Sequence, residues 1–212
     1  MNTFPRSLLL FGTFYGGMVT IAGVLGAKQV AFGPLAVEAG IFPFLTLVAL
    51  SSAVAELHGR AVAEQLVRYG FAPLVSAILL SLFVLALPTD PGMYPPAKAA
   101  FPIVLGQSWR MMVAGIISYG ISVRLNVWIF ARLALRADRF AALRGAVAAG
   151  LSQIVDTLIF ISISFLGVRP ILPLMAGQML TKLALSAVLV PLLITAAVRI
   201  GRRLDAASSP TG

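Results

Sequence analysis

The chain has 212 residues, of which 59% are hydrophobic and only 11% are charged, and its formal net charge is +9. A soluble domain is nearer to about half apolar and about a quarter charged, so the composition excludes an ordinary soluble protein and indicates an integral membrane protein. In so apolar a chain, the positive charge fits loops that face anionic lipid and the cytoplasm rather than a nucleic-acid partner. The chain has no cysteine, which excludes disulfides and thiolate metal sites.

Six continuous apolar runs predict an all-α, polytopic membrane protein with six transmembrane helices, because about 20 apolar residues cross a bilayer as a helix. The predicted spans are residues 7–27, 41–57, 71–87, 109–130, 145–167 and 171–199. They are expected to form one domain over residues 1–204, followed by a short disordered tail over 205–212. The Pro- and Gly-rich segment 89–102 is expected to be an external loop between the third and fourth spans.

The basic residues predict the orientation of these spans. If both termini are cytoplasmic, the cytoplasmic segments hold ten basic residues: Arg6, Arg60, Arg68, Arg132, Arg136, Arg139, Arg144, Arg199, Arg202 and Arg203. The external segments then hold three, which are Lys28, Lys98 and Arg169. The positive-inside rule therefore favours cytoplasmic N- and C-termini.

Asp156 lies near the middle of the predicted span 145–167 and is the most informative residue of the chain. A carboxylate at the bilayer centre costs about 2.5–3.5 kcal/mol on insertion scales, so it is expected to face a partner, a water-filled cavity or a substrate. Gln153, Thr157 and Phe160 recur beside it at helical spacings, which predicts one polar stripe that ends in an aromatic side chain. The alternative is a hydrogen-bond cluster that only holds the helices together.

Lys182 repeats this pattern in the last span, where Gln178 shares its face. Several apolar residues separate Lys182 from either end of the span, so its ammonium does not easily reach the interface. An ion pair with Asp156 would lower the cost of burying both charges. Such a pair is either purely structural or part of a substrate or proton pathway, and one pair can serve both roles if it opens when substrate binds.

The second span and the segment before it carry further candidates. Pro34, Gly40 and Pro43 are expected to break regular helix and to shape a re-entrant mouth. Ser52 and Glu56 lie one turn apart within the span. Because Glu56 is near the predicted cytoplasmic boundary, a solvated carboxylate is the alternative interpretation of this residue.

The other polar residues do not suggest catalysis. Tyr119 and Asn126 share one face of the fourth span, where they add a hydroxyl and an amide to the candidate site. No G-x-S-x-G elbow, H-E-x-x-H motif or P-loop occurs. One histidine and scattered carboxylates leave no metal-ligand cluster. The sequence therefore predicts a protein that is not an enzyme and that needs no cofactor or metal.

Several segments resemble the queuosine precursor transporter family, whose members are also called vitamin-uptake-like transporters. Residues 40–71 (GIFPFLTLVALSSAVAELHGRAVAEQLVRYGF) are similar to the family signature of an aromatic-Pro start, a helix with Asp, Glu and Gly, and an Ala-Arg amphipathic stretch. Residues 125–133 (LNVWIFARL) are similar to its Leu-Asp-Val-x-x-Phe run. Residues 152–167 (SQIVDTLIFISISFLG) are similar to its Gln/Asn-x-x-Asp-Thr-x-x-Phe run. Lys182 followed by Pro191 resembles the family's last span.

This resemblance implies a six-helix importer in the bacterial inner membrane. The implied cargo is 7-cyano-7-deazaguanine or its aminomethyl relative, which is salvaged for queuosine in tRNA. The chain departs from the family pattern at Ser52 and Asn126, which stand where the family often has Asp, whereas Asp156 matches. These departures leave the coupling ion and the exact cargo open.

The candidate residues suit a flat heterocycle. A carboxylate such as Asp156 can accept hydrogen bonds from N1–H and the 2-amino group of a 7-deazaguanine at once. The amides can read O6 and the ring nitrogens, and aromatic rings can stack on its faces. The candidate substrate-binding residues are Asp156, Gln153, Asn126, Glu56, Lys182, Gln178, Phe160, Phe44, Tyr119 and Ser52.

Other functions fit the same residues. The chain can also be an importer of another small heterocycle or vitamin, or a substrate-capture subunit that needs a separate ATP-driven module. A non-transporting membrane scaffold is the alternative from a different class. The small-residue face Gly12-x-x-x-Gly16 can pack either within the bundle or between the protomers of a homodimer.

Overall fold

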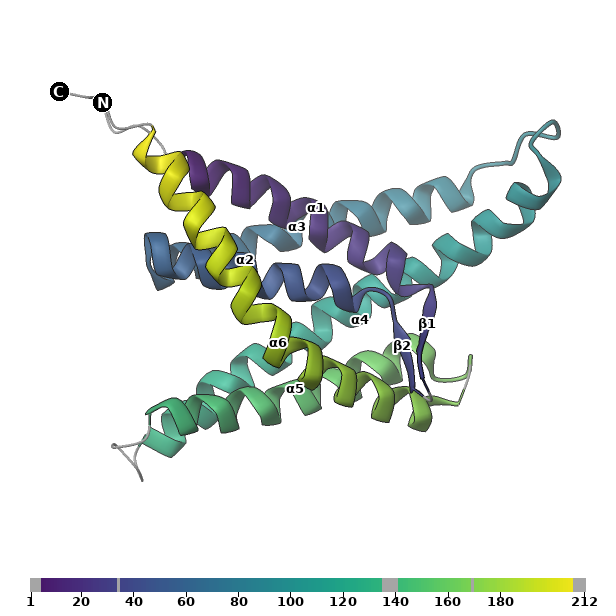
Figure 1. Ribbon diagram of the computed structural model, residues 1–212. Coiled ribbons are helices and arrows are strands. Elements are labelled where there is room, and N and C mark those ends of the chain that lie inside the picture. The colour runs from purple at the N-terminus through teal and green to yellow at the C-terminus, as the bar shows by residue number, and fades with distance from the viewer. Residues whose placement is uncertain (1–4, 34, 135–140, 169, 208–212) are drawn as a thin grey trace.

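The computed structural model describes residues 5–33, 35–134, 141–168 and 170–207 of the chain. The described residues form one bundle of helices with a short β-hairpin at one end (Figure 1). The helices are α1 (Arg6–Gly26), α2 (Ile41–His58), α3 (Arg60–Ala86), α4 (Pro95–Ala134), α5 (Ala141–Phe165) and α6 (Ile171–Ala206). The strands are β1 (Gln29–Phe32) and β2 (Leu35–Glu38).

The helices agree with a polytopic membrane protein. Within the described residues, five helices are long and apolar enough to cross a bilayer, and a shorter apolar helix covers Gly150–Phe165. The expected external loop is shorter than predicted, because α4 already begins at Pro95. Proline is tolerated in the first turn of a helix, where its missing N–H has no intrahelical acceptor.

The β-hairpin is a feature that the all-α prediction did not contain. Its strands pair antiparallel, with Gln29 opposite Glu38 and Phe32 opposite Leu35. The tight turn between them includes Gly33, whose φ of +57° is a conformation that glycine adopts without steric cost. Val37 is fully buried and packs with the start of α2 and with α6, which anchors the hairpin to the bundle.

The second helix follows the hairpin directly. It begins at Ile41, so Pro43 lies in its first turn and does not break it, contrary to the sequence-based expectation. It ends at His58, and the next residue, Gly59, has a φ of +88° that allows the chain to turn into α3. The amphipathic residues before the predicted third span are also helical, since α3 starts at Arg60.

The starts of α1 and of α3 and the end of α6 lie at one end of the bundle, here called the termini end (Figure 1). The Ser7 N–H donates to Asp205 Oδ1 at 3.0 Å, and the Ser7 hydroxyl donates to Asp205 Oδ2 at 2.7 Å. The same hydroxyl oxygen lies 2.7 Å from His58 Nε2. These contacts tie three helices together, and α6 continues to Ala206, beyond the start of the expected tail at residue 205.

The small-residue face of α1 packs inside the bundle. A side-chain carbon at Gly12 would meet Leu66 at 3.8 Å, and one at Gly16 would meet Pro73 at 3.5 Å. Both neighbours belong to α3. Of the two interpretations of this face, the structure therefore supports close helix packing within one chain.

Candidate functional site

The centre of the bundle contains a chamber of about 140 Å³. Side chains from all six helices and from β2 line it, and most of them are apolar or aromatic. A cavity of this kind is the usual form of a small-molecule site between helices. An apolar cavity of about 150 Å³ is known to take up a single aromatic ring, so this chamber is large enough to begin enclosing a flat heterocycle.

An ion pair between two helices lies at one wall of the chamber. Lys182 Nζ of α6 is 3.0 Å from Asp156 Oδ2 of α5, and each side chain is only 8% exposed. The Ser122 hydroxyl of α4 donates to Asp156 Oδ1 at 3.3 Å. Removing one partner of such a pair leaves an uncompensated buried charge, so the two residues depend on each other.

A second carboxylate, Glu38 at the end of β2, also faces the chamber. Its Oε1 accepts a hydrogen bond from Gln178 Nε2 at 2.7 Å, and its Oε2 accepts one from the Gly40 N–H at 2.8 Å. The Glu38 N–H donates in turn to Gln178 Oε1 at 3.2 Å. The Gln178 side chain of α6 therefore binds both the backbone N–H and the carboxylate of Glu38, and so holds the hairpin in place.

Two glycines make room for the Glu38 carboxylate. A side-chain carbon at Gly40 would lie 2.5 Å from Glu38 Oε2 and 2.6 Å from the backbone oxygen of Ala22. One at Gly26 would lie 2.9 Å from the same carboxylate oxygen. Because a backbone oxygen cannot turn aside as a side chain can, glycine is required at position 40 for this close approach.

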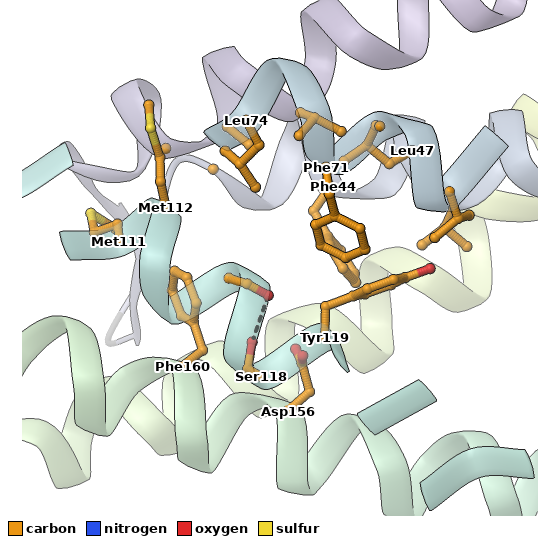
Figure 2. A pocket seen from close by; sticks show the side chains of 18 of the residues that line it. Phe44, Leu47, Phe71, Leu74, Met111, Met112, Ser118, Tyr119, Asp156 and Phe160 are labelled. Carbon is orange, nitrogen blue, oxygen red and sulfur yellow. Dashed lines mark hydrogen bonds between the residues drawn. The ribbon is translucent and has the colours of Figure 1, made fainter. Parts of the chain in front are cut away.

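Aromatic rings form other parts of the chamber wall. Figure 2 shows Asp156 and Phe160 projecting from α5 and Tyr119 from α4, towards Phe44 and Phe71. The Lys182 ammonium lies 4.6 Å from the centroid of the Phe44 ring, which is cation–π distance. The rings of Phe71 and Tyr119 are 5.8 Å apart between centroids. A flat ring that enters the chamber would therefore find aromatic surfaces beside the charged pair.

Several predicted site residues meet in this chamber. Five of the ten candidates line it: Asp156, Lys182, Phe160, Phe44 and Tyr119. Gln178 is fully buried behind the wall and reaches the chamber through Glu38. The ion pair that the sequence suggested between Asp156 and Lys182 is formed.

The other candidates lie elsewhere. Glu56 is 63% exposed near the termini end, where Arg202 is 3.9 Å away. Ser52 does not line the chamber, but its neighbour Ser51 does. Gln153 is not among the lining residues either, and its buried Oε1 has no hydrogen-bond partner in the described part of the chain. The side chain of Asn126 lies outside the described residues.

Glu38 is a charged residue of the chamber that was not among the ten candidates from the sequence. It lies in the segment GPLAVEAGIFPF, outside every predicted span, so it carried no evident membrane cost. A signal was nevertheless present, since it is a single acidic residue between an apolar stretch and the glycine that precedes a helix. Only the folded hairpin brings its carboxylate into the centre of the bundle.

A bundle of long apolar helices around a buried chamber that holds an ion pair is typical of one class of protein, the membrane transport proteins. Comparison with known proteins agrees, because a family model described as "Putative vitamin uptake transporter" matches residues 38–196. The chain belongs to this family. It is also 25% identical, over 181 residues, to the "Probable queuosine precursor transporter" of Bacillus subtilis (strain 168), a match that covers 82% of this chain and 78% of that protein. No solved structure matches the chain significantly.

Proposed function

We propose that this protein imports a queuosine precursor, 7-cyano-7-deazaguanine or its aminomethyl relative, across the bacterial inner membrane. The observation that carries the proposal is the buried ion pair of Asp156 and Lys182 on the wall of an aromatic-lined chamber. Membership of a transporter family and similarity to a protein named for this cargo support it. The proposed topology has six spans with both termini in the cytoplasm.

The charged pair suits the polar edge of a 7-deazaguanine. Asp156 accepts hydrogen bonds from N1–H and the 2-amino group, and Lys182 donates to O6. Both bonds to the carboxylate are charge-assisted and therefore stronger than neutral ones. The Asp156–Lys182 ion pair has to open partly for the base to make these hydrogen bonds. Substrate binding therefore replaces the ion pair with contacts between the base and the same carboxylate and ammonium groups.

The aromatic walls suit the faces of the same ring. Phe44, Phe160 and Tyr119 line the chamber beside the charged pair, and stacking of a base on an aromatic side chain contributes about 1–3 kcal/mol. The chamber lies between all six helices, as expected of a carrier that binds its substrate near the bilayer midplane.

The test uses bacterial cells that can neither make nor import the base. They express the wild-type protein, Asp156→Asn or the exposed control Glu64→Gln, and are fed each labelled precursor in turn. We expect uptake and restored tRNA queuosine with the wild type and the control, and loss of both with Asp156→Asn. Wild-type rates in Asp156→Asn would reject the role of Asp156.

Transport of another vitamin-like heterocycle is a second candidate, favoured by the description of the family. It predicts that neither precursor accumulates in cells with wild-type protein, while another flat heterocycle does. The thermal unfolding of the purified protein would be measured with each of several flat heterocycles. A heterocycle that raises the unfolding temperature would be identified as such a substrate.

A further inference from the structure

The chamber has more acidic than basic side chains in the described part of the chain. Its charged side chains in the described part of the chain are Glu38 from β2, Asp156 from α5 and Lys182 from α6. The other titratable lining groups are the phenols of Tyr15 on α1 and Tyr119 on α4, which are neutral at physiological pH. Lys182 is paired with Asp156 at 3.0 Å. The Glu38 carboxyl group is left without an ion-pair partner among the described residues.

Burial raises the pKa of the Glu38 carboxyl group above its ordinary value, whereas the Lys182 ammonium and two hydrogen-bond donors act to lower it. Both of its oxygens accept hydrogen bonds, one from an amide side chain and one from a backbone N–H. Such donors stabilise the charged form of a carboxylate. No ion pair of Glu38 occurs within the described ranges, and the side chain is buried. A buried charge of this kind is costly until a positive group approaches it.

We infer that Glu38 makes the chamber select a substrate that carries a protonated amine on a flat ring. This inference rests on the proposed function and narrows it to the aminomethyl form of the base over the cyano form. A primary alkyl amine is protonated at neutral pH, as the lysine side chain is, whereas a nitrile is neutral. The 7-substituent projects on the same side of the base as O6, so an amine there can reach Glu38 while O6 meets Lys182.

The aromatic walls add to this selection. Phe44 already lies against the ammonium of Lys182, at 4.6 Å from its ring centroid. The same kind of ring face attracts an alkylammonium group of a substrate. The Gln178 clamp holds the Glu38 carboxylate in place before the substrate arrives, which reduces the ordering cost of binding.

The experiment measures competition between the two labelled bases at equal concentration in proteoliposomes that hold the full chain. The variants are Glu38→Gln, which keeps the shape and removes the charge, Glu38→Asp, which keeps the charge, and the exposed control Glu64→Gln. For the wild type and the control we expect uptake of the amine to exceed that of the nitrile by about tenfold or more. Glu38→Gln should bring the ratio close to one because uptake of the amine falls more than uptake of the nitrile, and Glu38→Asp should retain part of the preference.

Two results would overturn the inference. One is a wild-type preference for the nitrile, which needs no variant and so does not depend on whether Glu38→Gln folds. The other is an unchanged ratio in Glu38→Gln, which would show that its charge does not select the cargo. Failure of the proposed function is distinguishable from both, because then neither base enters proteoliposomes that contain the wild-type protein.

Discussion

The two halves of α6 show how differently the same types of side chain behave at different depths in the bundle. In the chamber, Lys182 and Asp156 form an ion pair in which both side chains are 8% exposed. Near the termini end, Arg202 and Glu56 approach to only 3.9 Å and are 70% and 63% exposed. Water screens the second pair and not the first, so a charge contributes to function or stability here only where packing removes it from solvent.

The polar cluster of Ser7, His58 and Asp205 at the termini end is intermediate between these two pairs in its exposure to solvent. Ser7 is fully buried, but His58 and Asp205 remain partly exposed. Its contacts join α1, α2 and α6, and none of Ser7, His58 and Asp205 is among the residues that line the chamber. We therefore interpret this cluster as a contact that stabilises the fold, and we propose the chamber as the site of function.

The largest expected effect follows from Lys182→Met. This change leaves Asp156 buried without its cation, so we expect a loss of about 3–5 kcal/mol in stability and loss of uptake. Thermal unfolding in detergent measures the loss of stability, and uptake of labelled base measures the loss of transport. The double variant Asp156→Asn/Lys182→Met should recover most of the stability and none of the uptake. Recovery of uptake as well would mean that the pair is only structural.

A smaller effect is expected at the hairpin. Gln178→Ala removes two hydrogen bonds to Glu38, one of them to its carboxylate, and should cost about 1.5–3 kcal/mol because a buried charged group loses a donor. Hydrogen exchange should increase in residues 29–38 before it increases elsewhere. The exposed residue Gln65 gives the matched control Gln65→Ala. Unchanged exchange in the hairpin would show that Gln178 does not hold it.

At the termini end, Ser7→Ala tests whether the cluster of Ser7, His58 and Asp205 contributes to stability alone, in contrast to the chamber. The variant leaves His58 and one oxygen of Asp205 without the Ser7 hydroxyl, while the Ser7 N–H still donates to Asp205. We expect a stability loss of about 1–2 kcal/mol and uptake close to that of the wild type. A loss of uptake without a loss of stability would instead give this cluster a role in transport.

The smallest effect should come from Glu56→Gln. Its carboxylate is largely exposed and 3.9 Å from Arg202, so the change should alter stability by less than about 1 kcal/mol. Uptake of either base should be unchanged. A strong uptake defect would contradict the comparison, because it would show that an exposed charge at this end contributes as much as a buried one.

Some of the site could be predicted because its cost is visible in the sequence. Asp156 and Lys182 interrupt apolar runs, and a charge in such a run needs a partner wherever the helices lie. Phe160 was predicted from its helical spacing to Asp156, and Phe44 and Tyr119 were predicted as rings that could stack on a flat base; all three line the chamber. Their roles in binding remain predictions.

Other residues could not be placed from the sequence, because small rotations of a helix decide which way a side chain points. Ser51 lines the chamber and Ser52 does not, although the two are adjacent. Successive residues differ by about 100° around a helix, and the packing of α2 against its neighbours sets the orientation. Glu38 was missed for a related reason, since its position depends on the pairing of two short strands.

The sequence by itself determined the class of protein and the approximate positions of its long helices, although α3 and α4 begin earlier than the predicted spans. Local apolar length and the cost of buried charge act without knowledge of neighbours. It also determined that Asp156 and Lys182 must be satisfied within the bundle. Only the tertiary structure decided which groups meet: it joined those two residues, placed the hairpin with Glu38 at the chamber, and left Glu56 near the surface. These outcomes depend on contacts between residues as far apart as Glu38 and Gln178, which no local pattern encodes.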